Sequence, residues 1–194
     1  LLKFYKPDQG HYLIDDQDSE ITSNDTWRRQ CGVVMQDGFI FSDSIAKNIA
    51  VNGHKIDYER LKEAAKLASI DEYIDEQLKA YETKLGHDGT TLSNGQRQRI
   101  LIARAIYKNP DYLFFDEATS SLDSNNESII TSNLQEFSKG KTAVVIAHRL
   151  STIVNADKIV VLEKGKVAEQ GTHKELLEKR GLYHKLVKNQ LDLN

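Results

Sequence analysis

Runs of consecutive apolar residues constrain the fold of this chain more than any other feature. Three strand candidates are apolar on successive residues, which is typical of strands covered on both faces in a parallel sheet. They lie at Tyr112–Phe115, Ala143–Ile146 and Lys158–Leu162. Further short strands are predicted at His11–Ile14, at Cys31–Met35 and, after a turn at Gly165, at Val167–Glu169. Because these strands alternate with helical stretches, the pattern predicts an α/β fold.

Capping residues mark where the helices begin. Ser93–Gln96 and Thr172–Glu175 each place a hydroxyl three residues before Gln or Glu, the arrangement of a capping box. The first box predicts a helix that runs to Tyr107, and the second predicts a helix near the C-terminus. A third helix is expected after Asp57 and through Leu67, since Asp caps well. Its buried face is predicted to carry Leu61, Ala64, Ala65 and Ala68.

The stretch from about residue 38 to 107 contains no convincing strand and interrupts the alternation. We therefore predict a helical subdomain at 38–107, inserted into a core formed by 1–37 and 108–194. A chain of 194 residues is long enough for one domain with a sizeable core. Its start, Leu1–Tyr5, lacks Met and resembles the end of a helix already under way, so we expect a piece of a longer protein.

Composition excludes several classes of function. The formal net charge of -3 provides no broad basic surface, so nucleic acid is not an expected partner. No apolar run approaches the length of a membrane span, and no signal peptide is evident. The single cysteine, Cys31, cannot form an internal disulfide, which agrees with a reducing compartment. It lies in an apolar run, so we expect a buried and unreactive thiol.

Two acids follow the apolar strand at Tyr112–Phe115. Asp116 and Glu117 would lie at the carboxyl end of the sheet, where α/β proteins bind their ligands. In nucleotide hydrolases the first such acid holds Mg²⁺, and an acid just beyond it can polarise the attacking water. Taken alone, the pattern is equally consistent with a strand that ends in solvated acids.

A glycine-containing turn, Leu92–Gln96, precedes the predicted helix to Tyr107. Its backbone N–H groups and the helix dipole suit an anion, and Ser93 could donate a hydroxyl to the same phosphate. An ordinary capped helix is the alternative, but basic residues at Arg97 and Arg99 oppose the dipole and remain unexplained by it.

Leu92–Gln96 resembles the LSGGQ signature of ABC ATPases, with Asn94 in place of a glycine; we call it the signature turn. Four further family motifs occur in the expected order along the whole chain, so chance is a poor explanation. They are the Q-loop glutamine Gln36, the acids Asp116 and Glu117, the D-loop Ser120-Ser121-Leu122-Asp123 and the switch histidine His148. The resemblance implies a P-loop NTPase (RecA-like) core of the ABC type.

The resemblance also implies roles for individual residues. Asp116 would bind Mg²⁺ and Glu117 would be the general base, while His148 would contact the γ-phosphate and the attacking water. Gln36 would sense Mg²⁺ and nucleotide. The resemblance also implies a second nucleotide-binding domain in a head-to-tail dimer. In that dimer the signature turn would bind the ATP held by the partner, through Ser93, Asn94, Gly95 and Gln96. Asp123 would couple the two sites.

Two departures from the family pattern matter. The phosphate-binding loop G-x-x-x-x-G-K-[ST] is absent from the sequence, and in the family it lies shortly before the position of Leu1. Gly140–Thr142 resembles its end, but Gln135 stands in place of the first glycine and a strand follows instead of a helix. We therefore expect this chain alone to be inactive. The second departure, Asn94, adds a side chain near the phosphate, and Asn tolerates left-handed backbone.

Several phrases resemble exporters in particular, notably Gln36–Ile45, Ala147–Ile153 and Glu169–His173. Tyr81–Gly86 occupies the segment that in exporters faces the transmembrane domain. The ending 179–190 is similar to bacterial peptidase-containing peptide exporters. The resemblance thus implies an ATP-hydrolysing domain of a peptide exporter, with a transmembrane domain fused upstream, at the cytoplasmic face of the cell membrane. Two alternatives are a soluble ABC ATPase of DNA repair or translation and a truncated, non-catalytic module.

Overall fold

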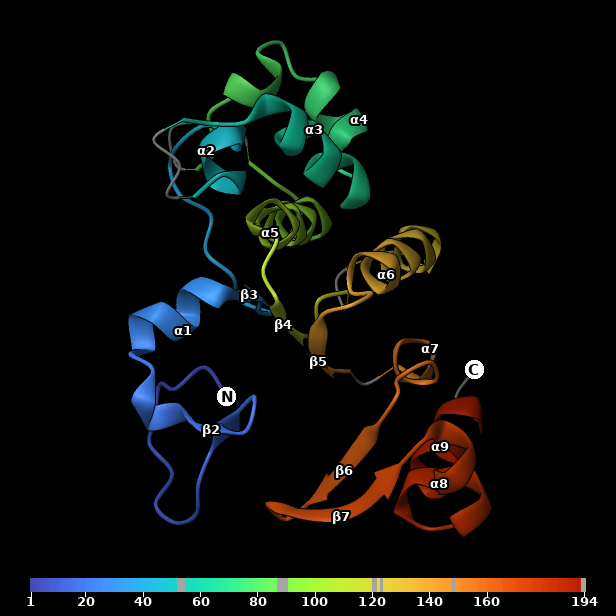
Figure 1. Cartoon of the computed structure of the whole chain (residues 1–194). Coiled ribbons are helices and arrows are strands. Elements are labelled where there is room, and N and C mark those ends of the chain that lie inside the picture. Colours follow the sequence, from blue (N-terminus) through green and yellow to red (C-terminus); the bar gives the residue numbers. More distant parts are fainter. Residues whose placement is uncertain (52–54, 87–90, 120–121, 123, 148, 193–194) are drawn as a thin grey trace. The chain divides into compact units, whose positions relative to one another are not determined.

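The computed structural model describes residues 1–51, 55–86, 91–119, 122, 124–147 and 149–192. Two compact units are present, Leu1–Val144 and Val145–Asn194, and each is described by itself. Figure 1 shows the order of their helices and strands. Among the described residues no helix is both long and apolar enough to cross a membrane.

A three-stranded sheet organises the first unit. Its strands are β3 (Cys31–Val34), β4 (Tyr112–Asp116) and β5 (Thr142–Ile146), in that order. β3 and β4 are parallel, with Cys31 opposite Tyr112 and Val34 opposite Phe115. The parallel pairing confirms the α/β fold predicted from the apolar runs, and both strands therefore end at the same edge of the sheet.

Burial of the strands differs from the prediction. In β4 only Leu113 and Phe115 are buried, whereas Phe114 is half-buried, so one face is better covered than the other. β5 is exposed along its length, whereas β3, the other outer strand of the three, is mostly buried. The expectation of strands buried on both faces was therefore wrong for β5 and holds only in part for β4, whose less covered face packs against Trp27.

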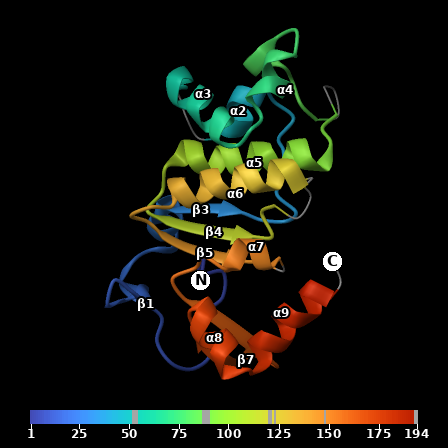
Figure 2. The ribbon, with the colours of Figure 1, turned by 90° about the vertical axis from the view of Figure 1, so that its right-hand side faces the viewer.

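One face of the sheet carries two long helices, α5 (Asn94–Lys108) and α6 (Ser124–Phe137), as Figure 2 shows. Shorter helices pack on the side of α5 that faces away from the strands. They are α2 (Ile45–Ile49), α3 (Tyr58–Leu67), α4 (Asp71–Asp75) and the 3₁₀ turn η2 (Ala80–Glu82). The described part of 38–107 holds one isolated bridge, Ser44 to Lys84, and no strand. The boundaries of the helical subdomain stay a prediction.

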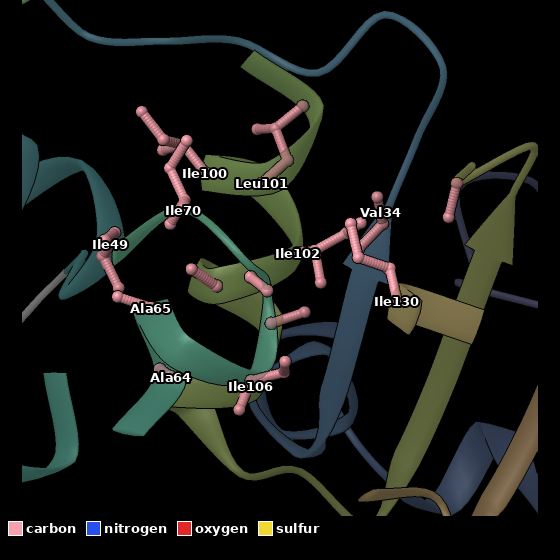
Figure 3. Packing of buried hydrophobic residues seen from close by; sticks show 14 of the residues in the cluster. Val34, Ile49, Ala64, Ala65, Ile70, Ile100, Leu101, Ile102, Ile106 and Ile130 are labelled. Atoms are coloured by element: carbon pink, nitrogen blue, oxygen red, sulfur yellow. The ribbon is translucent and has the colours of Figure 1, made fainter. Parts of the chain in front are cut away.

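The core of the first unit is built around α5, which is apolar on two sides. Figure 3 shows Ile106 beside Ala64 of α3, while Ile102 lies beside Val34 of β3 and Ile130 of α6. All five side chains are at most 1 % exposed, except Ile106 at 5 %. Burying an isoleucine contributes about 1.5–3 kcal/mol, so this packing holds α5 firmly between the sheet and the small helices.

The three predicted helix caps are present. Ser93 and Gln96 form a capping box at the start of α5, and Asp57 accepts hydrogen bonds from the first turn of α3. The predicted apolar face of α3 is fully buried. A second capping box joins Thr172 and Glu175 at the start of α8 (His173–Lys179). Each of these caps requires a partner only two or three positions away, which is why the sequence reveals them.

The N-terminal segment is not helical, so the expectation for Leu1–Tyr5 was wrong. Its backbone carbonyls instead accept hydrogen bonds from side chains of α1 (Asn24–Gln30): Trp27 Nε1 donates to Leu1 and Arg28 Nε donates to Leu2, both over 3.1 Å. Two elements lie between the N-terminal segment and α1 in the sequence. They are the hairpin of β1 (Leu13–Ile14) and β2 (Gln17–Asp18) and the 3₁₀ turn η1 (Ser19–Ile21).

The second unit is an antiparallel hairpin with helices against it. It comprises α7 (Leu150–Ile153), β6 (Ile159–Glu163), β7 (Lys166–Gly171), α8 and α9 (Leu182–Asp192). Lys164 and Gly165 both have positive φ, the geometry of a two-residue hairpin turn, which confirms the turn predicted at Gly165. β6 buries Ile159 and Val161 and exposes Val160. Burial on both faces was thus wrong here too, since a two-stranded ribbon has one covered face.

Candidate nucleotide site

Asp116, Glu117 and Gln36 lie at one edge of the sheet in the first unit. Asp116 ends β4, and Glu117 follows directly. Val34 is opposite Phe115, so Gln36 and Glu117 each come two residues after paired positions of neighbouring strands. Asp116 and Gln36 are exposed. Adjacent parallel strands lie about 4.8 Å apart, so these residues share the carboxyl edge where α/β sheets bind ligands.

The backbone turns sharply at the second acid. Glu117 has φ of +49°, in the left-handed region that residues with a side chain seldom occupy. The two residues after it, Ala118 and Thr119, are buried at 7 % and 8 % exposure. Burial of these two residues fixes the direction in which the chain leaves the sheet edge. Left-handed backbone at a residue with a side chain, as at Glu117, is often found at functional sites.

The signature turn ends in a closed hydrogen-bond pair. Gln96 N donates to Ser93 Oγ over 3.2 Å, and Ser93 N donates to Gln96 Oε1 over 2.9 Å. Ser93 and Asn94 are exposed, while Gly95 is half-buried. The Ser93 hydroxyl still has its own proton to donate, and the N–H groups of Asn94 and Gly95 belong to the first turn of α5, where helices leave N–H groups without partners in the helix.

Asn94 and Arg99 differ from their predicted settings. Asn94 is the first residue of α5 and is not among the positive-φ residues, so it needs no tolerance of left-handed backbone. Arg99 has a structural explanation, because its Nη1 donates to the carbonyl oxygen of Ser69 over 3.0 Å. Arg99 thus ties the start of α5 to the end of α3, and its charge is no evidence for an anion.

Gln98 is a residue that the sequence did not single out. Its side chain is 4 % exposed, and its Nε2 donates to the carbonyl oxygen of Glu117 over 3.0 Å. The contact joins the second turn of α5 to the residue after β4. The sequence offered only one signal for it, a polar residue on the face of the helix that otherwise carries apolar side chains.

A partly buried polar network supports the segment after Gln36. Arg104 of α5 donates to the carbonyl oxygens of Asn48 and Phe39 over 2.7 and 2.9 Å. Its guanidinium also lies 5.3 Å from the ring centroid of Phe41. Burial lowers the pKa of Arg104. Phe39 and Phe41 are in edge-to-face contact and remain 68 % and 43 % exposed, so the network presents two aromatic rings on the surface.

The segment just before the signature turn pairs with this same region. Ile45 N donates to the carbonyl oxygen of Thr83 over 3.0 Å, and Leu85 N donates to that of Asp43 over 2.9 Å. Ser44 and Lys84 form the isolated bridge between them. The two exporter-like segments, 36–45 and 81–86, are thus neighbours in the structure although about 40 residues separate them.

The remaining predicted site residues are not all described. His148, Asp123, Ser120 and Ser121 lie outside the described residues. The rejected look-alike Gly140–Thr142 leads into β5, with Gly140 at φ of +74° in the turn before it. A phosphate-binding loop follows a strand and opens a helix, so the rejection from sequence is consistent with the structure.

Comparison with known proteins identifies the family. Residues 1–120 match the family model described as ABC transporter. The chain belongs to the ABC transporter family. Two relatives are translocation ATP-binding proteins. The toxin RTX-I translocation ATP-binding protein of Actinobacillus pleuropneumoniae is 50 % identical over 95 % of this chain and 26 % of its own length. The leukotoxin protein LktB from Mannheimia haemolytica is 49 % identical over 100 % of this chain and 27 % of its own.

A solved structure supports the ABC assignment of the fold. A bacterial Atm1-family ABC exporter with ATP bound matches with a TM-score of 0.93 and 41 % identity, over 98 % of this chain and 34 % of that one. The fold is therefore the ABC type of P-loop NTPase. The chain spans about a quarter of the length of the two translocation proteins and about a third of the solved exporter.

The donor set of this ABC site suits Mg²⁺ bound together with a nucleotide. Asp116 and Gln36 offer a carboxylate and an amide oxygen at one sheet edge. Mg²⁺ in nucleotide sites takes one or two protein oxygens and completes its shell with phosphates and water. Among the described residues no cluster of three or more His, Cys, Asp or Glu side chains could hold a metal alone. The donor set therefore fits a metal that binds together with nucleotide phosphates.

Proposed function

We propose that this chain is the ATP-binding and ATP-hydrolysing part of an ABC exporter. The observation that carries the proposal is the common sheet edge of Gln36, Asp116 and Glu117. The signature turn supports it, since its first-turn N–H groups and serine hydroxyl suit a phosphate. The relatives named as translocation ATP-binding proteins support the exporter class.

The proposed reaction is transfer of the γ-phosphoryl group of ATP to water. Glu117 accepts a proton from the attacking water, a P–O bond forms to that water, and the bond to the β-phosphate oxygen breaks to release ADP. Asp116 and Gln36 would hold Mg²⁺, which would supply charge neutralisation at the phosphates. His148 is proposed to hydrogen-bond the γ-phosphate and the attacking water. These assignments rest on the match of the motifs in the sequence.

The proposed assembly is a head-to-tail dimer joined to a transmembrane domain at the cytoplasmic face of the membrane. In it, Ser93, Asn94, Gly95 and Gln96 serve the ATP of the partner, and Asp123 couples the sites. A two-fold axis would make both sites equivalent. The exposed pair Phe39 and Phe41, beside the paired segments 43–45 and 83–85, supports a contact with the membrane domain, because exposed aromatic clusters favour protein partners.

We infer that the exported cargo is a peptide or polypeptide. The relatives' names mention toxin and leukotoxin translocation, and the chain's ending resembles peptide exporters. Inverted membrane vesicles that contain the whole exporter should accumulate labelled peptide only with ATP. Accumulation of a small lipophilic dye but no peptide would contradict the cargo class. The alternative function, a soluble ABC ATPase, leaves the exporter-like segments unexplained, so we do not favour it.

The hydrolase role is tested with a fusion protein. In it, a segment of a family member that contains G-x-x-x-x-G-K-[ST] is joined before Leu1, and we call this fusion the completed chain. We expect the 194-residue chain alone not to hydrolyse Mg-ATP, because it lacks the backbone donors and lysine that neutralise the β- and γ-phosphates. The completed chain should hydrolyse it. Turnover by the chain alone, above that of its own Glu117→Gln variant, would contradict the first expectation.

The completed chain also tests the general base. Glu117→Gln should bind ATP normally, lose at least 100-fold in kcat and accumulate an ATP-bound dimer, since an amide keeps the shape and cannot accept a proton. Glu63→Gln, at an exposed position of α3, is the matched control and should leave kcat unchanged. Near-normal hydrolysis by Glu117→Gln would remove Glu117 from the base role.

A further inference from the structure

Gln98 joins two parts of the site that are distant in sequence. Nineteen residues separate it from Glu117, yet its Nε2 donates to the Glu117 carbonyl oxygen over 3.0 Å. At 4 % exposure this amide is buried. Burying a polar group costs free energy unless it is hydrogen-bonded, so the contact with Glu117 is part of what keeps Gln98 in place.

The acceptor of this hydrogen bond is an unusual peptide group. Glu117 is held at φ of +49°, which is unfavourable for a residue with a side chain. A donor on its carbonyl oxygen fixes the orientation of the peptide group after the turn. The Glu117 side chain leaves the backbone at the Cα atom that carries this carbonyl group. A donor that holds the carbonyl group therefore also restrains the direction of the side chain.

The donor is carried by the helix that the signature turn opens. Ser93 caps α5, and Gln98 follows five residues later in the same continuous helix. Buried isoleucines pack α5 against the sheet and α3, so its first turn and Gln98 belong to one firmly packed helix, and a load on the signature turn is transmitted to Gln98.

We propose that Gln98 is a positioning residue that couples the signature turn to Glu117 of the same chain. The inference rests on the proposed function. Glu117 acts on the chain's own ATP, whereas the signature turn contacts the ATP of the partner. Gln98 therefore links the two ATP sites of the dimer: closure of one signature turn onto the partner's nucleotide sets the orientation of Glu117 in the other site.

The test measures steady-state hydrolysis by the completed chain and its Gln98→Met variant. Methionine has a similar volume but no donor. We expect kcat to fall about tenfold, the size expected for one buried hydrogen bond, while KM for ATP stays within about twofold. Gln135→Met, an exposed position in α6, is the matched control and should leave both constants unchanged. Gln98→Asn, too short to reach Glu117, provides a second variant should Gln98→Met not fold.

Coupling is tested by adding Ser93→Ala to both backgrounds. If Gln98 transmits the state of the signature turn, the loss in kcat from Ser93→Ala will be smaller in Gln98→Met than in the parent, because the link is already broken. Unchanged kcat in folded Gln98 variants, or losses that simply multiply, would overturn the inference. An inactive parent would instead overturn the proposed function, and the inference with it.

Discussion

The half-buried guanidinium of Arg104 is hydrogen-bonded to the buried residue Asn48. Arg104 Nε donates to the Asn48 carbonyl oxygen over 2.7 Å, and Arg104 Nη2 lies 3.4 Å from Asn48 Oδ1. The Asn48 side chain is fully buried and accepts from Phe41 N over 2.8 Å. Its Nδ2 donates to the carbonyl oxygens of Phe41, Asp43 and Ser44. One asparagine thus organises the segment after Gln36.

Asn48→Ala should therefore destabilise the first unit strongly. The substitution removes the hydrogen bonds that the Asn48 side chain makes with the Phe41 backbone and the Arg104 guanidinium in a partly buried setting, and we expect a loss of about 2–3 kcal/mol in the free energy of unfolding. Urea denaturation followed by circular dichroism measures it. Lys47→Ala, on the same helix, removes only an exposed ion pair with Asp43 and should cost less than about 0.5 kcal/mol. Equal losses in the two variants would contradict the role of Asn48.

Two positions test the backbone conformation of turns in opposite directions. Asp16 has φ of +62° in the turn between β1 and β2. Asp16→Gly should stabilise the first unit by about 0.5–1 kcal/mol, because glycine removes the cost of left-handed backbone, and this gain exceeds the conformational entropy that glycine loses on folding.

Gly140 has φ of +74° and open space around an added Cβ, so Gly140→Ala should destabilise by about 1 kcal/mol through the backbone alone. Thermal unfolding of both variants must show shifts of opposite sign.

Cys31 should resist thiol reagents in the folded protein. Its side chain is 2 % exposed, and burial raises its pKa from 9.0 to about 11. At pH 8 only about one thiol in a thousand is then ionised, so reaction with DTNB should be at least 100-fold slower than for a free thiol and should recover in urea. Because the folded pKa lies above the unfolded one, the contribution of the thiol to stability is complete below pH 9 and is lost as the pH rises toward 11. Fast labelling at pH 8 would contradict the buried setting.

The sequence predicted those features that depend on residues close together in the chain. The capping boxes at Ser93 and Thr172 and the cap at Asp57 are present because each needs a partner only two or three residues away. The hydrogen bonds from Gln98 to Glu117 and from Arg104 to Phe39 span 19 and 65 residues, and no local pattern indicates them. Burial of β5 was predicted wrongly because apolarity marks a strand without determining how many neighbours cover it.

The second unit offers a pH-dependent helix cap. Both oxygens of the Glu169 carboxylate accept backbone hydrogen bonds at the start of α9, from Leu182 N over 2.7 Å and Tyr183 N over 3.0 Å. These bonds lower the pKa of Glu169 below its ordinary value of 4.5. The cap is therefore complete above pH 4.5 and is lost as the pH falls through the lowered value.

The measurement for Glu169 is an NMR titration of the two amide groups. The Leu182 and Tyr183 amide protons should shift together with a midpoint below 4.5, and their exchange with solvent should accelerate over the same range. In Glu169→Gln both titrations should vanish, whereas Glu178→Gln, at an exposed position in α8, should keep them. A midpoint at or above 4.5 would show that the carboxylate does not cap α9.

The last prediction asks which ATP the signature turn serves. Its N–H groups and the dipole of α5 suit an anion. If the turn contacts the ATP of the partner, changing it must leave ATP binding to the monomer intact and alter only ATP-driven dimerisation and turnover. In the completed chain, Ser93→Arg should bind ATP as the parent does but fail to dimerise, since a long cationic side chain fills the space where the partner must approach.

Asn94→Gly refines the same experiment. Asn94 occupies the first position of α5 with ordinary helical backbone, so the glycine removes one exposed side chain near the proposed phosphate contact without relieving strain. We expect unchanged nucleotide affinity of the monomer and a dimer fraction and kcat equal to the parent's or up to about threefold higher, because less steric bulk opposes closure. Calorimetry measures affinity, and size-exclusion chromatography at saturating ATP measures the dimer. Weakened ATP binding to the Ser93→Arg monomer, with normal dimerisation, would mean that the turn acts on the chain's own nucleotide.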